Sequence, residues 1–138
     1  MIFKKQINIV IVDDHQGVRT GLRNILERNA GFHVVGEGEN GLEALKLVDA
    51  QVPDVVLLDV ELPIMRGEDV MKKINQDHPG IKVLAVSSYD DRAYIQGMLD
   101  NGASGYLLKE DAPELLVKAV RGILHGEVTW LSPRLDRF

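Results

Sequence analysis

Short runs of apolar residues alternate along the chain with longer amphipathic segments. The apolar runs cover residues 7–12, 34–35, 55–58, 83–86 and 106–108. The longest of these runs are almost continuously apolar and rich in β-branched residues, which is typical of strands buried on both faces of a parallel sheet. The pattern therefore predicts five buried strands.

Five segments with the periodicity of an amphipathic helix lie between and after these runs. They cover residues 16–30, 41–51, 67–77 and 91–101, and a last segment begins at Asp111. Asn40 and Asp111 are expected to cap the second and the fifth helix, because a glutamate follows each of them three residues later. The order strand–helix, repeated five times, predicts right-handed crossovers and one parallel sheet with helices on both faces.

Length and composition narrow the class of protein. The chain has 138 residues, of which 45% are hydrophobic, and this predicts one globular domain. We expect the domain to span residues 1–130 and residues 131–138 to form a tail or the start of a linker, with no strand partner for residues 132–138. The absence of cysteine excludes disulfides, thiolate zinc sites and a cysteine nucleophile.

Charge and hydropathy bear on location and partners. The net charge of −5 makes this chain a poor candidate for binding the phosphate backbone of nucleic acids. No apolar run reaches the roughly 18 residues that span a membrane, and no signal-peptide pattern is found. We therefore expect a cytoplasmic protein with no membrane partner.

Polar residues follow four of the predicted strands at the point where each strand ends. Asp13 and Asp14 follow the first strand and Asp59 the third, while Ser87 ends the fourth and Lys109 follows the fifth. Ligands of open parallel sheets bind beyond the carboxyl ends of the strands. If the first and third strands are central, three carboxylates converge at one edge beside a hydroxyl and an ammonium group.

Such a cluster has a specific chemistry. Two carboxylates about 4 Å apart repel each other by roughly 4 kcal/mol at an effective dielectric constant near 20, so the cluster needs raised pKa values or a bound cation. Oxygen ligands without a nearby histidine or cysteine favour Mg²⁺, Mn²⁺ or Ca²⁺ over zinc. A metal and a lysine around one carboxylate can hold a phosphoryl group. A single aspartate at a strand end is more often a turn or a helix cap, so the prediction depends on the coincidence of all four strand ends.

Four segments resemble the receiver domain of two-component response regulators. These segments are residues 13–14 (DD), 59–67 (DVELPIMRG), 86–89 (VSSY) and 102–109 (GASGYLLK). The resemblance covers about residues 8–130. The segment 102–109, together with His-Gly-Glu-Val at 125–128, is similar to the NarL/LuxR/FixJ-type subfamily, whose members carry a helix-turn-helix DNA-binding domain.

The resemblance implies a fold and a phosphorylation site. The implied fold is α/β and flavodoxin-like, a (βα)5 doubly wound parallel sheet with strand order 2-1-3-4-5. Asp59 would accept a phosphoryl group from a sensor histidine kinase. Mg²⁺ (or Mn²⁺) would be held by Asp13, Asp14, Asp59 and the backbone carbonyl of Glu61.

The resemblance also implies how the phosphorylated state is read. Ser87 would donate a hydrogen bond to one phosphoryl oxygen, and Lys109 would pair with another. Tyr106 would turn inward when Ser87 moves, so that Ser87 and Tyr106 form the switch. The phosphoryl contacts exist in one of two states and bias the equilibrium toward it.

The expected function is a phosphorylation-activated switch that controls transcription through a C-terminal DNA-binding domain outside this chain. Its expected partners are the histidine kinase and a second copy in a phosphorylation-dependent homodimer, with DNA bound only by the absent domain. The domain would assist its own phosphorylation and dephosphorylation without acting on external substrates. Two alternatives stay open: a stand-alone receiver acting by protein contact or as a phosphate sink, and a small phosphohydrolase with Asp59 as nucleophile.

Some residues depart from the family pattern. Glu61, two residues after Asp59, is predicted to lie on the exposed rim and to alter the lifetime of the phosphorylated state. Arg66 replaces a small polar residue, so the third helix should lack its usual cap. His15 is expected to be exposed to solvent, with a position at the rim of the acidic site as the alternative. The G-x-G-x-x-G pattern at residues 36–41 matches the fingerprint of dinucleotide-binding folds. It is interpreted as a turn into the second helix, because Glu37 and Glu39 would repel a pyrophosphate.

Overall fold

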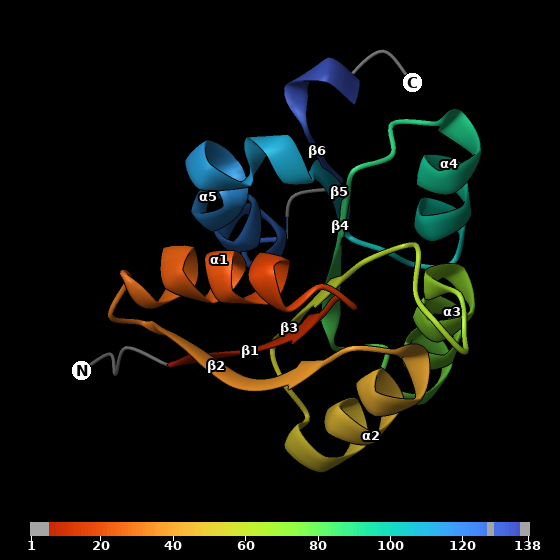
Figure 1. The fold of residues 1–138 in the computed structure, drawn as a ribbon, viewed down its shortest axis with the longest axis horizontal. Helices are drawn as coiled ribbons and strands as arrows, with labels where there is room; N and C mark the ends of the chain where they lie inside the picture. The colour runs from red at the N-terminus through yellow and green to blue at the C-terminus, as the bar shows by residue number, and fades with distance from the viewer. Residues whose placement is uncertain (1–5, 127–128, 136–138) are drawn as a thin grey trace.

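The computed structural model describes residues 6–126 and 129–135, and these form a parallel sheet between two layers of helices (Figure 1). The strands are β1 (Ile7–Val12), β2 (Phe32–Gly38), β3 (Val55–Leu58), β4 (Lys82–Ser87), β5 (Gly105–Leu108) and β6 (Trp130–Leu131). The helices are α1 (Gln16–Glu27), α2 (Gly41–Gln51), α3 (Gly67–Asp77), α4 (Arg92–Asp100) and α5 (Ala112–Leu124). Figure 1 shows α1 and α5 on one face of the sheet and α2, α3 and α4 on the other.

The strand order is β2-β1-β3-β4-β5-β6, and every neighbouring pair is parallel. This confirms the predicted doubly wound fold and adds a short sixth strand at one end. In the pairing of β1 with β3, Val12 lies opposite Leu58. Both central strands therefore end at the same level, and the residue after each strand reaches the same edge of the sheet.

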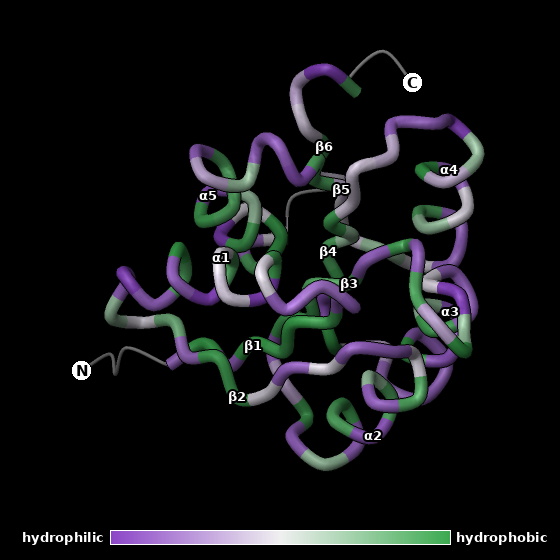
Figure 2. Tube along the Cα trace, viewed as in Figure 1, coloured by the Kyte–Doolittle hydropathy of each residue, from purple (hydrophilic) through white to green (hydrophobic). Residues whose placement is uncertain are grey.

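Alternation along the strands divides the core into two clusters. Ile9 and Ile11 of β1 pack toward α1 and α5, whereas Val10 and Val12 pack toward α2, α3 and α4. All four are at most 1% exposed. Because both faces of the strand are covered, both sets of side chains are apolar, which accounts for the continuous runs in the sequence (Figure 2).

The helix predictions are confirmed to within a few residues. α2 and α3 have the predicted bounds, whereas α1 ends three residues earlier than the periodicity predicted. Asn40 caps α2, since its Oδ1 accepts a hydrogen bond of 2.9 Å from the N–H of Glu43. Arg66 precedes α3 without a side-chain cap, as predicted.

The predicted cap at Asp111 is wrong. Asp111 makes no side-chain hydrogen bond to the start of α5, and its own φ and ψ of −90° and −8° are helical. A capping residue needs extended backbone to direct its side chain at the helix N–H groups. Here a short 3₁₀ turn, Lys109–Asp111, leads directly into the helix and leaves no extended position.

Leu131, which the sequence placed in the tail, belongs instead to a strand. Trp130 and Leu131 pair with Gly105 and Tyr106 of β5. Ser132 is fully buried, and its Oγ accepts a hydrogen bond of 2.8 Å from the N–H of Leu108. Residues 127–128 of the family-like motif and residues 136–138 of the predicted tail lie outside the described residues.

The glycines of the G-x-G-x-x-G pattern lie against α2 and against the loop after β3. A Cβ on Gly36 would lie 2.8 Å from Leu47 Cδ2, and one on Gly41 would lie 2.5 Å from Met65 Cβ. A side chain at residue 41 would therefore clash with Met65 near its backbone, whereas one at residue 36 would require Leu47 to move. In residues 6–126 and 129–135, no helix combines the length and the apolar character needed to cross a membrane.

Candidate functional site

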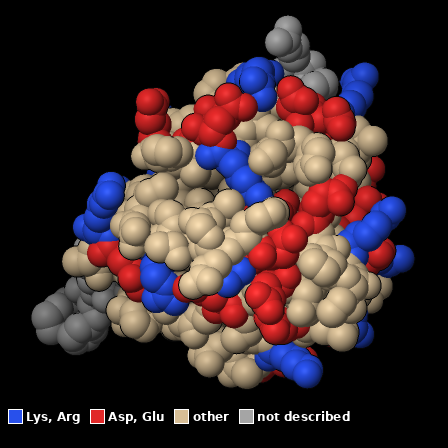
Figure 3. Space-filling model, in the orientation of Figure 1, with Lys and Arg blue, Asp and Glu red and all other residues tan. Residues whose placement is uncertain are grey.

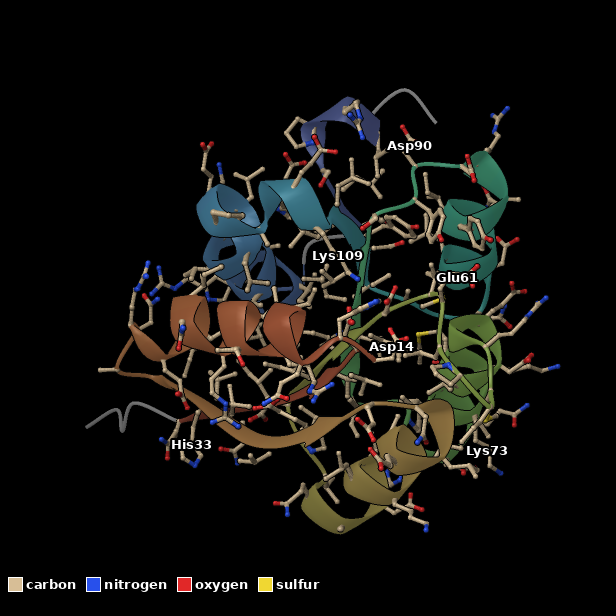
Figure 4. The ribbon with its side chains drawn as sticks, in the orientation of Figure 1. Asp14, His33, Glu61, Lys73, Asp90 and Lys109 are labelled. Atoms are coloured by element: carbon tan, nitrogen blue, oxygen red, sulfur yellow. The ribbon has the colours of Figure 1, made fainter. Side chains whose placement is uncertain are left out.

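The predicted polar residues meet at the carboxyl edge of the sheet. Asp13 and Asp59 are buried, and the backbone N–H of Asp59 donates to the carbonyl of Val12. Figure 4 shows Asp14 and Lys109 around this edge, and Figure 3 shows acidic side chains gathered on the same face of the molecule. Because β1 and β3 end at the same level, the carboxylates of Asp13 and Asp59 come together.

Lys109 links the two buried carboxylates. Its Nζ lies 2.7 Å from Asp13 Oδ2 and 3.2 Å from Asp59 Oδ2. Burial alone would lower the pKa of Lys109, but the hydrogen bond to Asp13 and the charge of Asp59 outweigh burial and raise this pKa. Lys109 is therefore a firmly charged ammonium group between two acids.

The pKa values of the two buried carboxyls move in opposite directions. Burial raises the pKa of Asp59 to about 6, and the charge of Asp13 adds to this against the opposing effect of Lys109. Burial would also raise the pKa of Asp13, but hydrogen bonds from Lys109 and from the backbone N–H of His15 lower it overall. The single ammonium group of Lys109 does not balance the carboxylates around it, so the edge carries excess negative charge that a bound cation can offset.

The donor set around Asp13 fits a divalent cation. Asp13, Asp14 and His15 each offer a ligand atom, and these atoms all lie within 4.8 Å of one another. His15 Nδ1 is 2.9 Å from Asp14 Oδ1 and 3.2 Å from Asp13 Oδ1. The assumption that no histidine lies near the acids is therefore wrong, although the His15 side chain is 70% exposed as predicted. Its backbone N–H bonds to Asp13, which holds the ring at the rim.

Asp59 is linked to Asp13 through Lys109, and Glu61 is linked to Asp59 through its backbone N–H. Asp59 shares Lys109 with Asp13, and its Oδ1 accepts a hydrogen bond of 3.3 Å from the N–H of Glu61. The loop after β3 is therefore tied to the Asp59 carboxylate. This bond directs the N–H of Glu61 toward Asp59, while the Glu61 side chain is exposed.

Ser87 and Tyr106 both bond to the backbone of Tyr89. Ser87 Oγ accepts a hydrogen bond of 3.0 Å from the N–H of Tyr89, and the Tyr106 hydroxyl donates one of 2.7 Å to the Tyr89 carbonyl. Both Ser87 and Tyr106 are 0% exposed. Burial raises the pKa of Tyr106 to about 12, against the opposing effect of its hydrogen bond with Ser87. Ser87 and Tyr106 are therefore linked through the backbone of Tyr89.

Tyr94 is a residue of the site that the sequence did not reveal. Its hydroxyl donates a hydrogen bond of 2.5 Å to Glu61 Oε1, and this bond is the main cause of a raised pKa of Tyr94. Its ring centroid lies 5.0 Å from that of Tyr89. Tyr94 and Glu61 are 33 residues apart, so no local pattern signals the contact.

Arg134 is a second such residue. Its Nη2 lies 3.1 Å from Glu110 Oε1 and 3.5 Å from Asp90 Oδ2. These acids lie on the loops that follow Lys109 and Ser87 respectively. The C-terminal segment after β6 is therefore joined to both loops of the site.

Comparison with known proteins gives a consistent result. A model of the family described as "Response regulator receiver domain" matches residues 9–121. The transcriptional regulatory protein DegU of Brevibacillus brevis is 42% identical over 123 residues, which are 89% of this chain and 52% of DegU. The response regulator UvrY of Escherichia coli O6:H1 is 36% identical over 121 residues, which are 88% of this chain and 56% of UvrY. The chain thus spans about half the length of these curated relatives.

Solved structures agree with these relatives. A two-component response regulator of the LuxR family from Aurantimonas sp. SI85-9A1 superposes with a TM-score of 0.90 at 33% identity, covering 96% of this chain and 94% of that one. The isolated receiver domain of RcsB from Salmonella enterica serovar Typhimurium, solved with the phosphomimetic BeF3⁻, superposes with a TM-score of 0.88 at 26% identity. That match covers 96% of this chain and 98% of the RcsB domain.

Proposed function

Because this chain belongs to the response regulator receiver domain family, we propose that it is a phosphorylation-activated switch in which Asp59 accepts a phosphoryl group from a sensor histidine kinase. One observation carries the assignment of the acceptor. Asp59 is a buried carboxylate at the end of a central strand, and its Oδ2 lies 3.2 Å from the ammonium group of Lys109. A nucleophile for phosphoryl transfer needs a fixed position and a positive charge beside it.

The proposed transfer uses this geometry. An oxygen of the Asp59 carboxylate attacks phosphorus, the phosphorus–nitrogen bond of the phosphohistidine breaks, and its electron pair stays with the histidine nitrogen. The product is an acyl phosphate. Lys109 offsets the charge of the phosphoryl oxygens, and the pKa of Asp59 near 6 leaves its carboxylate mostly ionised at neutral pH.

The acidic edge would hold the divalent cation that this chemistry requires. Asp13 and Asp14 are the proposed ligands, with Asp59 and the backbone carbonyl of Glu61, and Mg²⁺ or Mn²⁺ suits these oxygen donors. When bound, the cation supplies positive charge to the phosphoryl oxygens. The excess negative charge around Asp13 and Asp59 supports this assignment.

The switch consists of Ser87 and Tyr106. In the activated state Ser87 would leave the N–H of Tyr89 and donate its hydroxyl hydrogen to a phosphoryl oxygen. Tyr106 is already 0% exposed in this structure, so its response would be a change in its hydrogen bond to the Tyr89 carbonyl and not the predicted inward turn. New contacts that exist only in the phosphorylated state shift the population toward that state.

The output of the whole protein is proposed to be transcription. The relatives include proteins named as transcriptional regulators that are about twice as long as the matched region. A structure of RcsB contains two RcsB dimers bound to two parallel DNAs. By analogy, residues beyond 135 would lead to a DNA-binding domain, and the cytoplasmic protein would dimerise when phosphorylated. A stand-alone receiver that acts by protein contact or as a phosphate sink is the alternative, and the length of the gene separates the two.

The acceptor is tested with acetyl phosphate and Mg²⁺. We expect the wild-type chain to take up one phosphoryl group, as counted by intact mass spectrometry, and Asp59→Asn to take up none. Asp77→Asn, on the exposed side of α3, is the matched control and should behave as the wild type. Uptake of one equivalent by Asp59→Asn would overturn the assignment. Continuous turnover of phosphomonoesters would favour a phosphohydrolase.

A further inference from the structure

Arg19 connects helix α1 to the backbone of the acidic edge. Its Nη1 donates a hydrogen bond of 2.7 Å to the carbonyl oxygen of Asp13, and its Nε donates one of 3.0 Å to Glu37 Oε1 on β2. The Arg19 side chain is only 13% exposed. A planar guanidinium held at two points has little freedom, so it fixes the carbonyl to which it bonds.

The carbonyl of Asp13 belongs to the peptide that joins Asp13 to Asp14. The Asp13 side chain is held independently, by Lys109 and by the N–H of His15. The Asp14 carboxylate is 34% exposed and contacts the exposed ring of His15. The direction of the Asp14 side chain therefore depends on the orientation of the preceding peptide, and Arg19 holds the oxygen of that peptide.

We propose that Arg19 is a positioning residue for the divalent-cation site. It orients the Asp13–Asp14 peptide so that the Asp14 carboxylate faces the cation, and Glu37 keeps the guanidinium in place. The inference rests on the proposed function, because it concerns the cation that this function requires. It gives a role in the site to an ion pair between α1 and β2 that makes no contact with Asp59.

Arg23 provides a matched comparison on the same helix. Its Nε donates a hydrogen bond of 2.7 Å to the other oxygen of Glu37, and its Nη1 lies 3.2 Å from Glu27 Oε2. Among the described residues, Arg23 thus bonds to two carboxylates and not to the carbonyl of Asp13. Arg19 and Arg23 therefore share their charge, their helix and one partner, but differ in the contact that the proposal invokes.

An electrostatic effect and a positioning role of Arg19 predict opposite changes in cation affinity when Arg19 is removed. A positive charge near a cation site repels the cation, so removing Arg19 should tighten cation binding if charge alone mattered. If Arg19 positions Asp14, its removal should weaken binding. Substitution of a residue that orients a metal ligand typically costs about 10- to 100-fold in metal affinity. The sign of the change therefore decides between the two.

The test is calorimetric titration of the unphosphorylated chain with MgCl₂. We expect Arg19→Ala to weaken Mg²⁺ binding by about tenfold and Arg23→Ala to leave it within about twofold of wild type. Arg19→Lys keeps the charge and loses the two-point fork, so it should lie between wild type and Arg19→Ala. Thermal unfolding confirms that each variant is folded at the titration temperature. If Arg19→Ala does not fold, the Mg²⁺ affinities of Arg19→Lys and Arg23→Lys are compared instead. The positioning role then requires weaker binding in Arg19→Lys than in Arg23→Lys.

The outcomes separate this inference from the proposed function. Wild-type affinity or tighter binding in Arg19→Ala overturns the positioning role, as does an equal loss in Arg23→Ala. Absence of Mg²⁺ binding by the wild-type chain overturns the cation site itself. A second readout is the Mg²⁺-dependent shift of the Asp14 amide in ¹H–¹⁵N NMR spectra, which should shrink in Arg19→Ala and persist in Arg23→Ala.

Discussion

The ammonium group of Lys109 lies closer to Asp13, at 2.7 Å, than to Asp59, at 3.2 Å. In this state the lysine is bonded to a proposed cation ligand more closely than to the proposed phosphoryl acceptor. A cation bound at Asp13 would compete with Lys109 for the same carboxylate and favour its movement toward Asp59. Cation binding and phosphorylation would then both favour movement of Lys109 toward Asp59.

The buried carboxyl of Asp59 should make stability depend on pH. Its pKa is raised from 3.8 to about 6, so between these pH values the folded state holds a proton that the unfolded state has lost. The stability contributed by the protonated carboxyl is complete below pH 3.8 and is lost as the pH rises through 6. Without divalent cations, Asp59→Asn should therefore be more stable than wild type at pH 7.5, by about 1–3 kcal/mol.

Urea denaturation at pH 7.5 and pH 4.5 measures this difference. The advantage of Asp59→Asn should shrink at pH 4.5, where wild-type Asp59 is mostly protonated. Asp77→Asn, at an exposed position, should change stability by less than about 0.5 kcal/mol at both pH values. An advantage that is the same at both pH values would contradict the raised pKa.

Mg²⁺ should stabilise the folded chain through Asp14. A ligand that binds only the folded state at 100 times its dissociation constant adds about 2.7 kcal/mol to the free energy of unfolding. Asp14→Asn should lose most of this gain, because one of the proposed ligand oxygens is replaced by a neutral amide. Thermal unfolding with EDTA and with excess MgCl₂ measures the effect. A similar Mg²⁺-induced rise in Tm for both proteins would place the cation elsewhere.

Ser132 should contribute to stability although it lies beyond the predicted domain boundary. It is fully buried, and Ser132→Ala would leave the buried N–H of Leu108 without its acceptor at 2.8 Å. An unsatisfied buried donor costs about 1–3 kcal/mol. Ser88→Ala, at an exposed position, should cost less than about 0.5 kcal/mol. Equal free energies of unfolding for the two variants would mean that the C-terminal segment is not part of the folded unit.

Tyr94 and Glu61 should affect the lifetime of the acyl phosphate in opposite directions. The Tyr94 hydroxyl bonds the Glu61 carboxylate at 2.5 Å, so this group would orient water toward Asp59 only when the bond is open. We expect Tyr94→Phe to speed dephosphorylation and Glu61→Ala to slow it, each by about two- to tenfold, within the range of general-base effects. Decay of radiolabelled protein gives the rates. Equal rates for wild type and Glu61→Ala would remove Glu61 from the mechanism.

The fold was predictable because its signals are local. The continuous apolar runs identify strands that are covered on both faces, and the amphipathic segments identify the helices between them. The site was predictable for a related reason. Parallel strands end at one edge of the sheet, so Asp13, Asp59 and Lys109 meet once their strands are recognised, whatever the details of packing.

The contacts between elements were decided by the tertiary structure alone. β6 contains two residues, which is too short for a periodic pattern, and it forms because Trp130 and Leu131 meet the free edge of β5. The bonds of Arg19 to Asp13 and of Tyr94 to Glu61 depend on how α1 and α4 pack against the sheet. Local patterning therefore predicted the first five strands, the helices and the edge where the acids meet. Packing decided which groups hold those acids in place, because side-chain partners far apart in sequence are set by the relative positions of whole elements.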